Sequence, residues 1–319
     1  MIVVVTPNPA LDLTWSLPAL ERGESHRVGA GHSRAGGKGV NVARVLHALG
    51  RPVIAVAPCP VSGDGAVFAD DLRAAGIPAD LVPRAGSLRR SVAIVEDGTG
   101  TATLLNERGS ALSRAELAAL VRAATARLSD ARVLVVSGSL PPGTPDGVVG
   151  GLVREARRRG IAVIADVAGP ALREAARAGA DLVKPNAVEL VEATGAADPA
   201  EGIRRLLADG ARMVAASFGA DGLCIARGGG AEPEAVRARM PRPLLGNATG
   251  AGDAAVASLA RDLADGVGDL AILARRAAGL SAAAVLAPYA GEVSPTHPAL
   301  VSEAIVAPGI PRLRERTPV

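Results

Sequence analysis

The sequence predicts an α/β fold in which a parallel β-sheet is flanked by helices and a small β-sheet forms a lid. Short apolar runs rich in β-branched residues alternate with amphipathic segments through most of the chain. Two further stretches alternate apolar and polar residues instead, which is typical of half-exposed strands. A length of 319 residues suits one large α/β core and requires no second one.

The predicted main sheet consists of short, unbroken apolar runs, the pattern of strands buried on both faces. These runs are MIVVV (1–5), VIAVA (53–57), RVLVVS (132–137), IAVIAD (161–166), DLVK (181–184) and RMVAAS (212–217). Amphipathic helices are predicted at 39–49, 64–75, 113–128, 146–159, 169–178, 186–194 and 199–209, and then at 252–265, 269–286 and 296–306. This alternating order predicts parallel strands with helices on both faces.

Two segments interrupt the alternation, at 13–30 and 90–105. Both are predicted to form antiparallel strands separated by turn residues. Since so few strands cannot bury a core of their own, we expect a lid over the active site or an edge where two chains meet. The main domain then comprises residues 1–12, 31–89 and 106–310, and residues 311–319 are expected to be a poorly ordered tail.

The composition disfavours several classes of function. Apolar residues make up 49% and charged residues 21% of the chain, as in ordinary globular proteins, while aromatic residues make up 1% and leave little for stacking on bases. The net charge of +3 comes from arginines scattered along the chain, so nucleic acid is not the expected partner.

The cysteines, the histidines and the N-terminal residues argue against a disulfide-rich, metal-binding, secreted or membrane protein. Cys59 and Cys224 are too few for a disulfide framework, and neither they nor the four histidines stand at metal-ligand spacing. The N-terminal MIVVVTPNPA resembles no signal peptide, and no run approaches the roughly eighteen apolar residues of a membrane span. We therefore expect a cytoplasmic protein that does not contact membranes.

Only two of the 35 lysine and arginine residues are lysines, Lys38 and Lys184. Both stand in turns marked by glycine or proline, in RAGGKGVN and LVKPNAVEL. A compact ammonium and a broad guanidinium fork are not interchangeable in a tight site. We therefore expect both lysines to contact a ligand.

Polar turn segments follow four of the predicted strands. TPNPALD, with Asp12, follows the first strand, and SGSLPPG, KPNAVEL and FGADG follow three later ones. Each could be a simple turn, since these residue types favour turns for local reasons. Parallel α/β folds bind ligands at the carboxyl ends of their strands, so together the four segments indicate a site at that edge.

The stretch GNATGAGDAAVASLARDL (246–263) places glycines and an aspartate directly before a helix. The amides of Gly250, Ala251, Gly252 and Asp253 are expected to be free and, with the helix dipole, to attract a phosphate. Asp253 itself has two interpretations. It is either the N-cap of the helix or a general base beside a phosphoryl group in transfer.

Other phosphate-binding and hydrolytic motifs are missing from the sequence. Lys38 is followed by glycine and not by Ser or Thr, which excludes a P-loop, and the first strand is followed by no glycine-rich dinucleotide fingerprint. No nucleophile elbow follows a strand. The remaining chemistry is phosphoryl transfer, in which the protein mainly orients a hydroxyl and a phosphate. GGKG (36–39) is a second glycine-rich helix start, and Asp12 and Asn41 are suited to bind sugar hydroxyls.

Six motifs in order, TPNPALD, AGGKGVNVARVLHALG, SGSLPPG, KPNAVEL, SFGADG and TGAGDA, make the chain resemble the PfkB (ribokinase-like) carbohydrate kinases. Within that family it is most similar to the 1-phosphofructokinase and tagatose-6-phosphate kinase branch, over residues 1 to about 290. The resemblance implies a Rossmann-like α/β domain with a β-lid, ATP and Mg²⁺ as cofactors, and phosphorylation of a sugar or sugar phosphate.

The resemblance also implies roles for residues of the motifs. Asp253 matches the general base, and Gly250, Ala251 and Gly252 match the anion hole. The remaining positions are, for the sugar, Asp12, Gly36, Gly37 and Asn41; for its phosphate, Lys38, Arg89, Ser139 and Arg27; and for the nucleotide, Lys184, Asn186, Glu189, Ser217, Gly219 and Gly222. Glu189 is also expected to arrange Mg²⁺ through water. Arg89 fits the family pattern through RRSV, but its neighbour Arg90 is an alternative.

The resemblance implies fructose 1-phosphate as the preferred acceptor of the phosphoryl group. Fructose 6-phosphate, tagatose 6-phosphate and an unphosphorylated sugar are alternatives. A sensor that binds a sugar phosphate without chemistry is a further alternative. The sequence departs from the family at Asp166-Val167-Ala168-Gly169, where relatives often read Asp-Ser-Ser-Gly, and at Ala254-Ala255, where they read Ser-Phe. A homodimer formed through the lid is expected.

Overall fold

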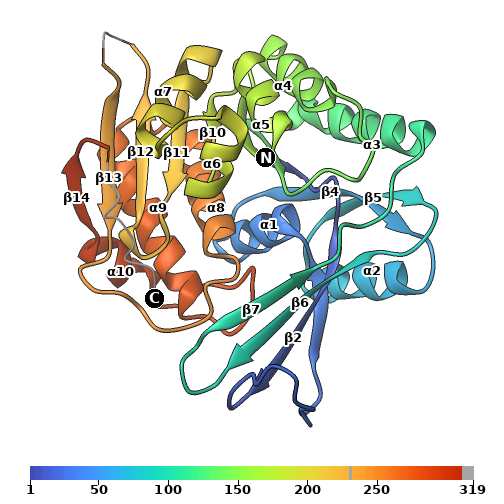
Figure 1. Ribbon diagram of the computed structural model, residues 1–319. Coiled ribbons are helices and arrows are strands. Elements are labelled where there is room, and N and C mark those ends of the chain that lie inside the picture. The colour runs from blue at the N-terminus through green and yellow to red at the C-terminus, as the bar shows by residue number, and fades with distance from the viewer. Residues whose placement is uncertain (230–231, 311–319) are drawn as a thin grey trace.

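The computed structural model describes residues 1–229 and 232–310. Figure 1 shows a large sheet between helices and a smaller sheet projecting from it. The tail predicted for residues 311–319 lies outside the described residues. Cys59 and Cys224 are both buried.

The main sheet has ten strands, and the β-branched runs of the sequence form its centre. From one edge to the other they are β5 (Ala79–Arg84), β4 (Val53–Pro60), β1 (Ile2–Val5), β8 (Val133–Ser137), β9 (Ala162–Asp166), β10 (Leu182–Val183), β11 (Met213–Ser217), β12 (Leu223–Arg227), β13 (Glu234–Arg239) and β14 (Ile305–Pro308). The strands from β5 to β11 are parallel. The predicted α/β fold with a parallel sheet is confirmed.

Helices cover both faces of this sheet and bury separate halves of the core. One face packs against α1 (Lys38–Ala48), α2 (Asp64–Ala74), α8 (Ala251–Ala264) and α9 (Leu270–Val285), with α10 (His297–Glu303) against α9. The other face packs against α3 (Arg114–Ala126), α4 (Val148–Arg158), α5 (Pro170–Arg177), α6 (Ala187–Thr194) and α7 (Pro199–Asp209). The short 3₁₀ helices are η1 (Arg127–Asp130) and η2 (Gly219–Asp221).

One edge of the sheet differs from the prediction. The strands β12, β13 and β14 pair antiparallel. The sequence predicted no strand at β12, at β13 or, on the opposite edge of the sheet, at β5. The helix predicted at 296–306 ends at Glu303, because the apolar segment Ile305–Pro308 pairs with β13 instead. β5 and β13 are half exposed, so their sequences lack the continuous apolar runs that identify central strands, whereas the short buried run of β12 was not recognised as a strand.

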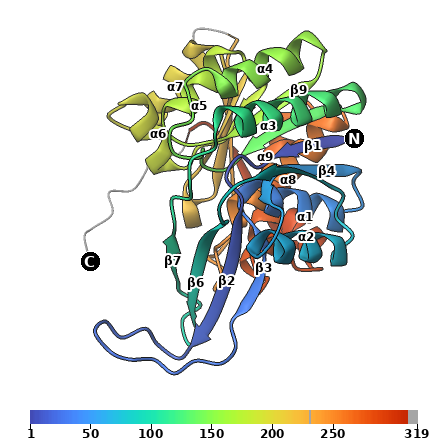
Figure 2. The same cartoon turned by 90° about the vertical axis from the view of Figure 1, so that its right-hand side faces the viewer.

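The lid is a four-stranded sheet in the order β3 (His32–Gly36), β2 (Ala10–Leu17), β6 (Arg89–Glu96), β7 (Ala102–Asn106). Figure 2 shows it extending away from the helical layers. Its pairing is antiparallel except between β2 and β6, which are parallel. The prediction of a uniformly antiparallel lid was therefore wrong, and most of the predicted segment 13–30 forms the loop that joins β2 to β3.

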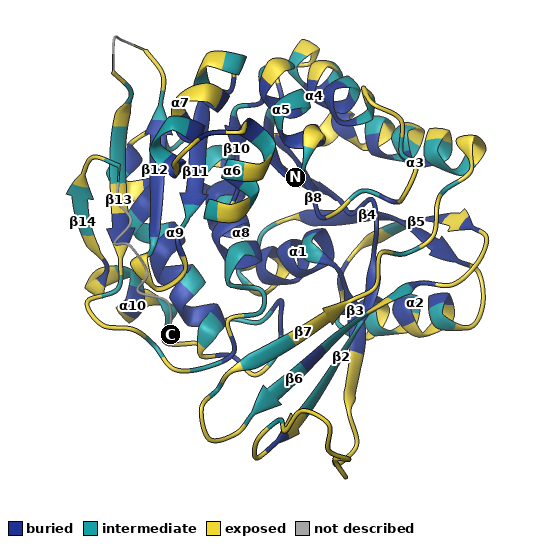
Figure 3. Ribbon diagram, in the orientation of Figure 1, coloured by how far each residue is buried: buried dark blue, intermediate teal, exposed yellow. Residues whose placement is uncertain are grey.

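Burial differs between the two sheets. Figure 3 shows buried residues throughout the central strands of the main sheet, whereas the lid strands mix buried, intermediate and exposed residues. No helix within the described residues combines the length and the apolar character needed to cross a bilayer.

Candidate active site

A cleft of about 860 Å³ lies at the carboxyl edge of the parallel strands, where the sequence predicted a site. Its floor includes the last residues of β9 and β11, Asp166 and Ser217, and the residue after β10, Lys184. The N-termini of α1 and α8 open into it, and Arg89 and Ser91 of the lid strand β6 line it from the other side. The fold therefore gathers the polar strand ends and both glycine-rich helix starts in one cleft.

The N-terminus of α8 is only partly free to bind an anion. Gly250 is its N-cap, with φ near +86°, a conformation that favours glycine, and an added Cβ would lie 3.0 Å from Ala290 Cα. The Ala251 amide donates to Ala248 O at 3.2 Å, and the Ala254 amide begins the helical ladder by donating to Gly250 O at 2.9 Å. The prediction that the Ala251 amide is free was therefore wrong, since the tight turn uses it.

Asp253 is the third residue of α8 and does not cap the helix. Its residue is only 6% exposed, and its Oδ2 accepts a hydrogen bond from Asn41 Nδ2 at 2.9 Å. The interpretation of Asp253 as the N-cap was therefore wrong, because the cap position belongs to Gly250. What remains is a buried carboxylate facing the cleft.

The environment raises the pKa of Asp253 to about 7. Burial is the largest cause, and the negative charge of Asp166 adds to it. The Lys38 ammonium and the hydrogen bond from Asn41 lower the pKa of Asp253 and so limit the increase. A carboxylate whose pKa lies near neutrality has the proton affinity that suits a general base.

Asp12 lies in β2 against the glycine turn that precedes α1. An added Cβ at Gly36 would lie 2.0 Å from Asp12 Cγ and 2.1 Å from its Oδ2, so only glycine leaves room for this carboxyl. Gly37 is the N-cap of α1, with φ near +97°. Burial raises the pKa of Asp12 to about 6, against the opposing charge of Arg89.

Both lysines of the chain contact the same carboxylate. Lys184 Nζ lies 3.2 Å and Lys38 Nζ 3.6 Å from Asp166 Oδ1, and Lys38 Nζ also lies 3.2 Å from Glu189 Oε1. Burial alone would raise the pKa of Asp166, but the two ammonium groups and a hydrogen bond from Ser137 hold it below its ordinary value. The Asp166 carboxylate in turn raises the pKa of Lys38. Lys38 therefore stays charged at the cleft floor.

Asn186 and Glu189 form a capping box at the start of α6. Asn186 Oδ1 accepts the amides of Val188 and Glu189 at 2.9 Å, and Glu189 Oε2 accepts the amide of Asn186 at 2.9 Å. Both residues line the cleft. Glu189 Oε1 is oriented toward Lys38 by the same arrangement.

The described residues include no group of three or more His, Cys, Asp or Glu side chains placed to hold a metal ion. Mg²⁺ commonly keeps several waters and binds one or two carboxylates together with substrate phosphates, so it needs no such group. Glu189 and Asp166, at the cleft floor beside two ammonium groups, fit a metal that arrives with a nucleotide.

Only some of the residues predicted to bind the phosphate of the substrate line the cleft. Arg89 and Ser139 line the cleft, whereas Arg90 points to α2 and forms an ion pair with Asp64 at 3.2 Å. Arg27 lies exposed in the loop between β2 and β3 and does not line the cleft. Gly219 begins η2 and Gly222 follows it, and neither residue lines the cleft.

Three residues were not predicted as site residues: Asp166 and Arg108, which line the cleft, and Asn8, which contacts residues that line it. Asp166 ends the strand IAVIAD, so the rule about strand ends could have identified it. Asn8 lies inside the TPNPALD motif but acts through contacts with distant residues. Arg108 follows a lid strand and resembles any exposed arginine in sequence.

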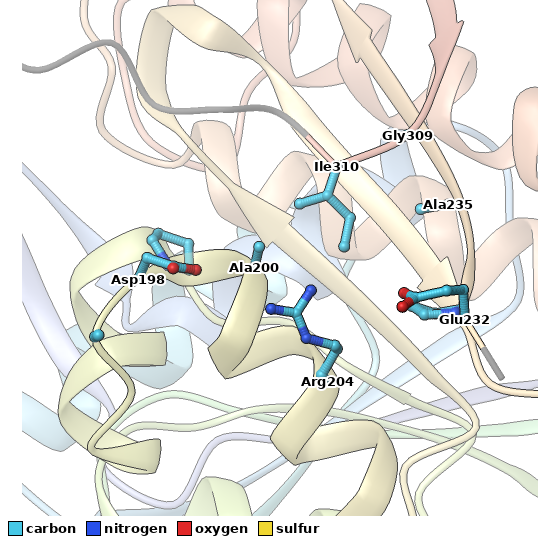
Figure 4. Close-up of a pocket in the computed structure, with 10 residues that line it drawn as sticks. Asp198, Ala200, Arg204, Glu232, Ala235, Gly309 and Ile310 are labelled. Carbon is cyan, nitrogen blue, oxygen red and sulfur yellow. The ribbon is translucent and has the colours of Figure 1, made fainter.

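A second hollow of about 690 Å³ lies beside α7 and β13, away from these residues. Figure 4 shows Asp198, Arg204 and Glu232 around it. Asp198 caps α7 by accepting the Glu201 amide at 2.8 Å, and Arg204 pairs with Glu201 at 3.2 Å. Both side chains therefore have structural partners within α7.

Comparisons with known proteins show which family the chain belongs to. The chain matches the pfkB family carbohydrate kinases over residues 8–297. It is 36% identical over 303 residues to the 1-phosphofructokinase of Rhodobacter capsulatus, covering 93% of this chain and 92% of the relative. It is 33% identical over 319 residues to the 1-phosphofructokinase of Xanthomonas campestris, covering 97% and 98%.

A solved structure, phosphofructokinase-2 from Escherichia coli in complex with fructose-6-phosphate, is similar with a TM-score of 0.80 at 25% identity, covering 94% of this chain and 98% of that chain. The match in fold extends over the lid as well as the main sheet, since it covers nearly the whole chain. The chain therefore belongs to the pfkB family of carbohydrate kinases and is a phosphotransferase with an alcohol group as acceptor.

Proposed function

We propose that this protein is a phosphofructokinase-type enzyme that transfers the γ-phosphoryl group of ATP to a free hydroxyl of fructose 1-phosphate, with Asp253 as general base. The observation that supports the base assignment best is the buried Asp253 carboxylate at the start of α8, in the cleft and hydrogen-bonded to Asn41. Two relatives at 33% and 36% identity are named 1-phosphofructokinase, which favours fructose 1-phosphate as acceptor.

In this proposal the acceptor hydroxyl lies against Asp253 and gives its proton to the carboxylate. The hydroxyl oxygen forms a bond to the γ-phosphorus while the bond from that phosphorus to the bridging oxygen breaks, so that ADP leaves. A pKa of about 7 lets Asp253 take the proton near neutral pH. The same buried setting holds the base close to the amides of Gly252 and Asp253, which precede the helical ladder and can receive developing charge.

The cations of the cleft are proposed to bind the phosphates on either side of the reacting centre. Lys184 lies close to the α8 N-terminus, since an added Cβ at Gly252 would be 3.4 Å from its Nζ, and this position suits the nucleotide phosphates. Lys38 and Arg89 suit the phosphate of the acceptor. Mg²⁺ bound with ATP would neutralise phosphate charge, and Glu189 and Asp166 would hold it, Glu189 through water that Asn186 helps to arrange.

Asp12 and Asn41 are proposed to orient the sugar hydroxyls. Both line the cleft next to the glycine turn, and Asn41 bonds Asp253 through one amide hydrogen. A sensor without catalysis would not need a buried base with a raised pKa, because burying a carboxylate costs free energy that binding alone does not require. This favours an enzyme over a sensor.

Fructose 6-phosphate is the second candidate acceptor, because a similar structure at 25% identity was solved with it. An assay of ADP release with fructose 1-phosphate, fructose 6-phosphate, tagatose 6-phosphate and free fructose separates the candidates. We expect the highest kcat/KM for fructose 1-phosphate. A preference for free fructose would contradict the assignment of a phosphorylated acceptor.

We also propose that two chains associate through their lids. The lid edge strand β7 exposes Leu104 and Leu105, which are 44% and 57% accessible, and an unpaired edge strand with apolar side chains favours pairing. Sedimentation of the Leu105→Lys variant tests this. The wild type should sediment as a dimer and the variant should shift toward a monomer.

A further inference from the structure

Asn8, in the loop after β1, contacts three cleft-lining residues from distant parts of the chain. Its side chain is 3% exposed, and Nδ2 donates to Arg108 O at 3.0 Å and to Ser139 Oγ at 3.1 Å. Its backbone carbonyl accepts a hydrogen bond from Arg89 Nε at 3.0 Å. One residue that does not itself line the cleft therefore fixes the positions of Arg89, Arg108 and Ser139, which do.

The packing around Asn8 restricts the conformation of its side chain. Gly109 has φ near +80°, and an added Cβ there would lie 2.6 Å from Asn8 Oδ1 and 3.3 Å from Arg89 Cδ. The backbone after β7 is therefore in close contact with Asn8 and with the aliphatic part of the Arg89 side chain. This close approach ties the segment that bears Arg108 to the main domain.

Arg108 differs from the neighbouring arginines in its partners. Arg90 pairs with Asp64, and Arg89 donates to the carbonyls of Asn8 and Glu107. Within the described residues, the Arg108 side chain makes neither an ion pair nor a hydrogen bond, although it lines the cleft. The adjacent acid Glu107 uses Oε2 to accept the Arg90 amide at 2.7 Å.

A guanidinium at a cleft wall without an acidic partner has its donors available for an anion of the substrate. Arg89 and Ser139 are the proposed contacts of the acceptor phosphate, and their attachment to Asn8 brings Arg108 to the same wall. Three donors of this kind can surround the oxygens of one phosphate.

We propose that Arg108 is a specificity-determining residue that binds the phosphate of the acceptor sugar, and that Asn8 is the positioning residue that assembles Arg89, Arg108 and Ser139 around it. This inference rests on the proposed function, since it needs a phosphorylated acceptor. It adds two residues to the proposed site and predicts that they act together.

The first test compares Arg108→Ala with Arg122→Ala, which removes an exposed arginine from α3. Arg108→Ala should raise KM for fructose 1-phosphate about tenfold or more, the effect of losing a charge-assisted contact, with little change in kcat or in KM for ATP. Inorganic phosphate should also become a weaker competitive inhibitor. The Arg122→Ala variant should match the wild type.

The second test is a double-mutant cycle with Asn8→Ala. If Asn8 acts by holding Arg108, the double variant should raise KM by clearly less than the product of the two single effects, because residues that act as a unit are not additive. A merely structural role for Asn8 would give multiplicative effects and a lower melting temperature instead. Cycles of Asn8→Ala with Arg122→Ala should be multiplicative.

The outcomes separate this inference from the proposed function. A wild type that phosphorylates free fructose as well as the sugar phosphates would overturn the proposed function. A wild type that requires the phosphate, together with an unchanged KM in Arg108→Ala, would overturn the inference alone. Arg108 is exposed, so this variant is expected to fold even where Asn8→Ala does not.

Discussion

Asn41 of α1 donates a hydrogen bond to Asp253 of α8 at 2.9 Å, across 212 positions of sequence. The contact joins the two glycine-rich helix starts that the sequence contains, because each residue lies in the first turn of its helix. Asn41 and Asp253 thus both line the same cleft with a fixed relative orientation.

Asp253→Asn should leave substrate binding nearly unchanged and lower kcat by about 10²–10⁴-fold, the usual contribution of an acid–base residue. The amide keeps the shape of the side chain but cannot take the proton. Steady-state kinetics and calorimetric binding of the sugar phosphate measure the two effects separately. A variant as active as the wild type would rule out Asp253 as the base.

The pH profile of kcat should show an ascending limb near pH 7, because Asp253 works only when deprotonated and its pKa is about 7. Asp166 contributes to that raised pKa through its negative charge. Asp166→Asn removes the charge, so the ascending limb should move to lower pH. A limb that moves upward, or a shift of the same size in the surface control Asp70→Asn, would contradict this assignment.

Gly36→Ala should raise KM for the sugar by about tenfold or more, since the new methyl group would occupy the space of the Asp12 carboxyl and displace it from the sugar. Gly151→Ala in α4 is the matched control, because a Cβ there meets no atom within 4 Å. That control should keep wild-type kinetics and a melting temperature at least as high. Equal KM values in both variants would exclude Asp12 from the sugar site.

Arg89→Ala should raise KM for phosphorylated acceptors about tenfold or more, with a smaller effect on free fructose, because it removes a charge-assisted contact to the phosphate. Arg90→Ala is the natural control, since this neighbour pairs with Asp64 of α2 and does not line the cleft. Kinetics with fructose 1-phosphate and free fructose measure the difference. If Arg90→Ala has the larger effect, the phosphate lies on the other side of β6.

The sequence predicted the central strands, most helices and the motif residues at the strand ends. Continuous apolar runs identify strands buried on both faces, so β1, β4, β8, β9 and β11 were predicted near their observed positions. The strands β5, β13 and β14 were missed because half-exposed strands contain few apolar residues, and β12 was missed although its residues 223–226 are buried. The two lysines were singled out by their rarity and by their place in glycine- or proline-marked turns, and both line the cleft.

The sequence by itself determined the α/β fold, the glycine turns and the residue types at the strand ends, because these depend on local periodicity and local backbone conformation. Only the tertiary structure decided which of these residues meet. It placed Gly250 and not Asp253 at the helix cap, turned Arg89 into the cleft and Arg90 toward Asp64, and joined Lys38 and Lys184 through Asp166. Such contacts depend on how distant segments pack, and no spacing along the chain encodes that packing directly.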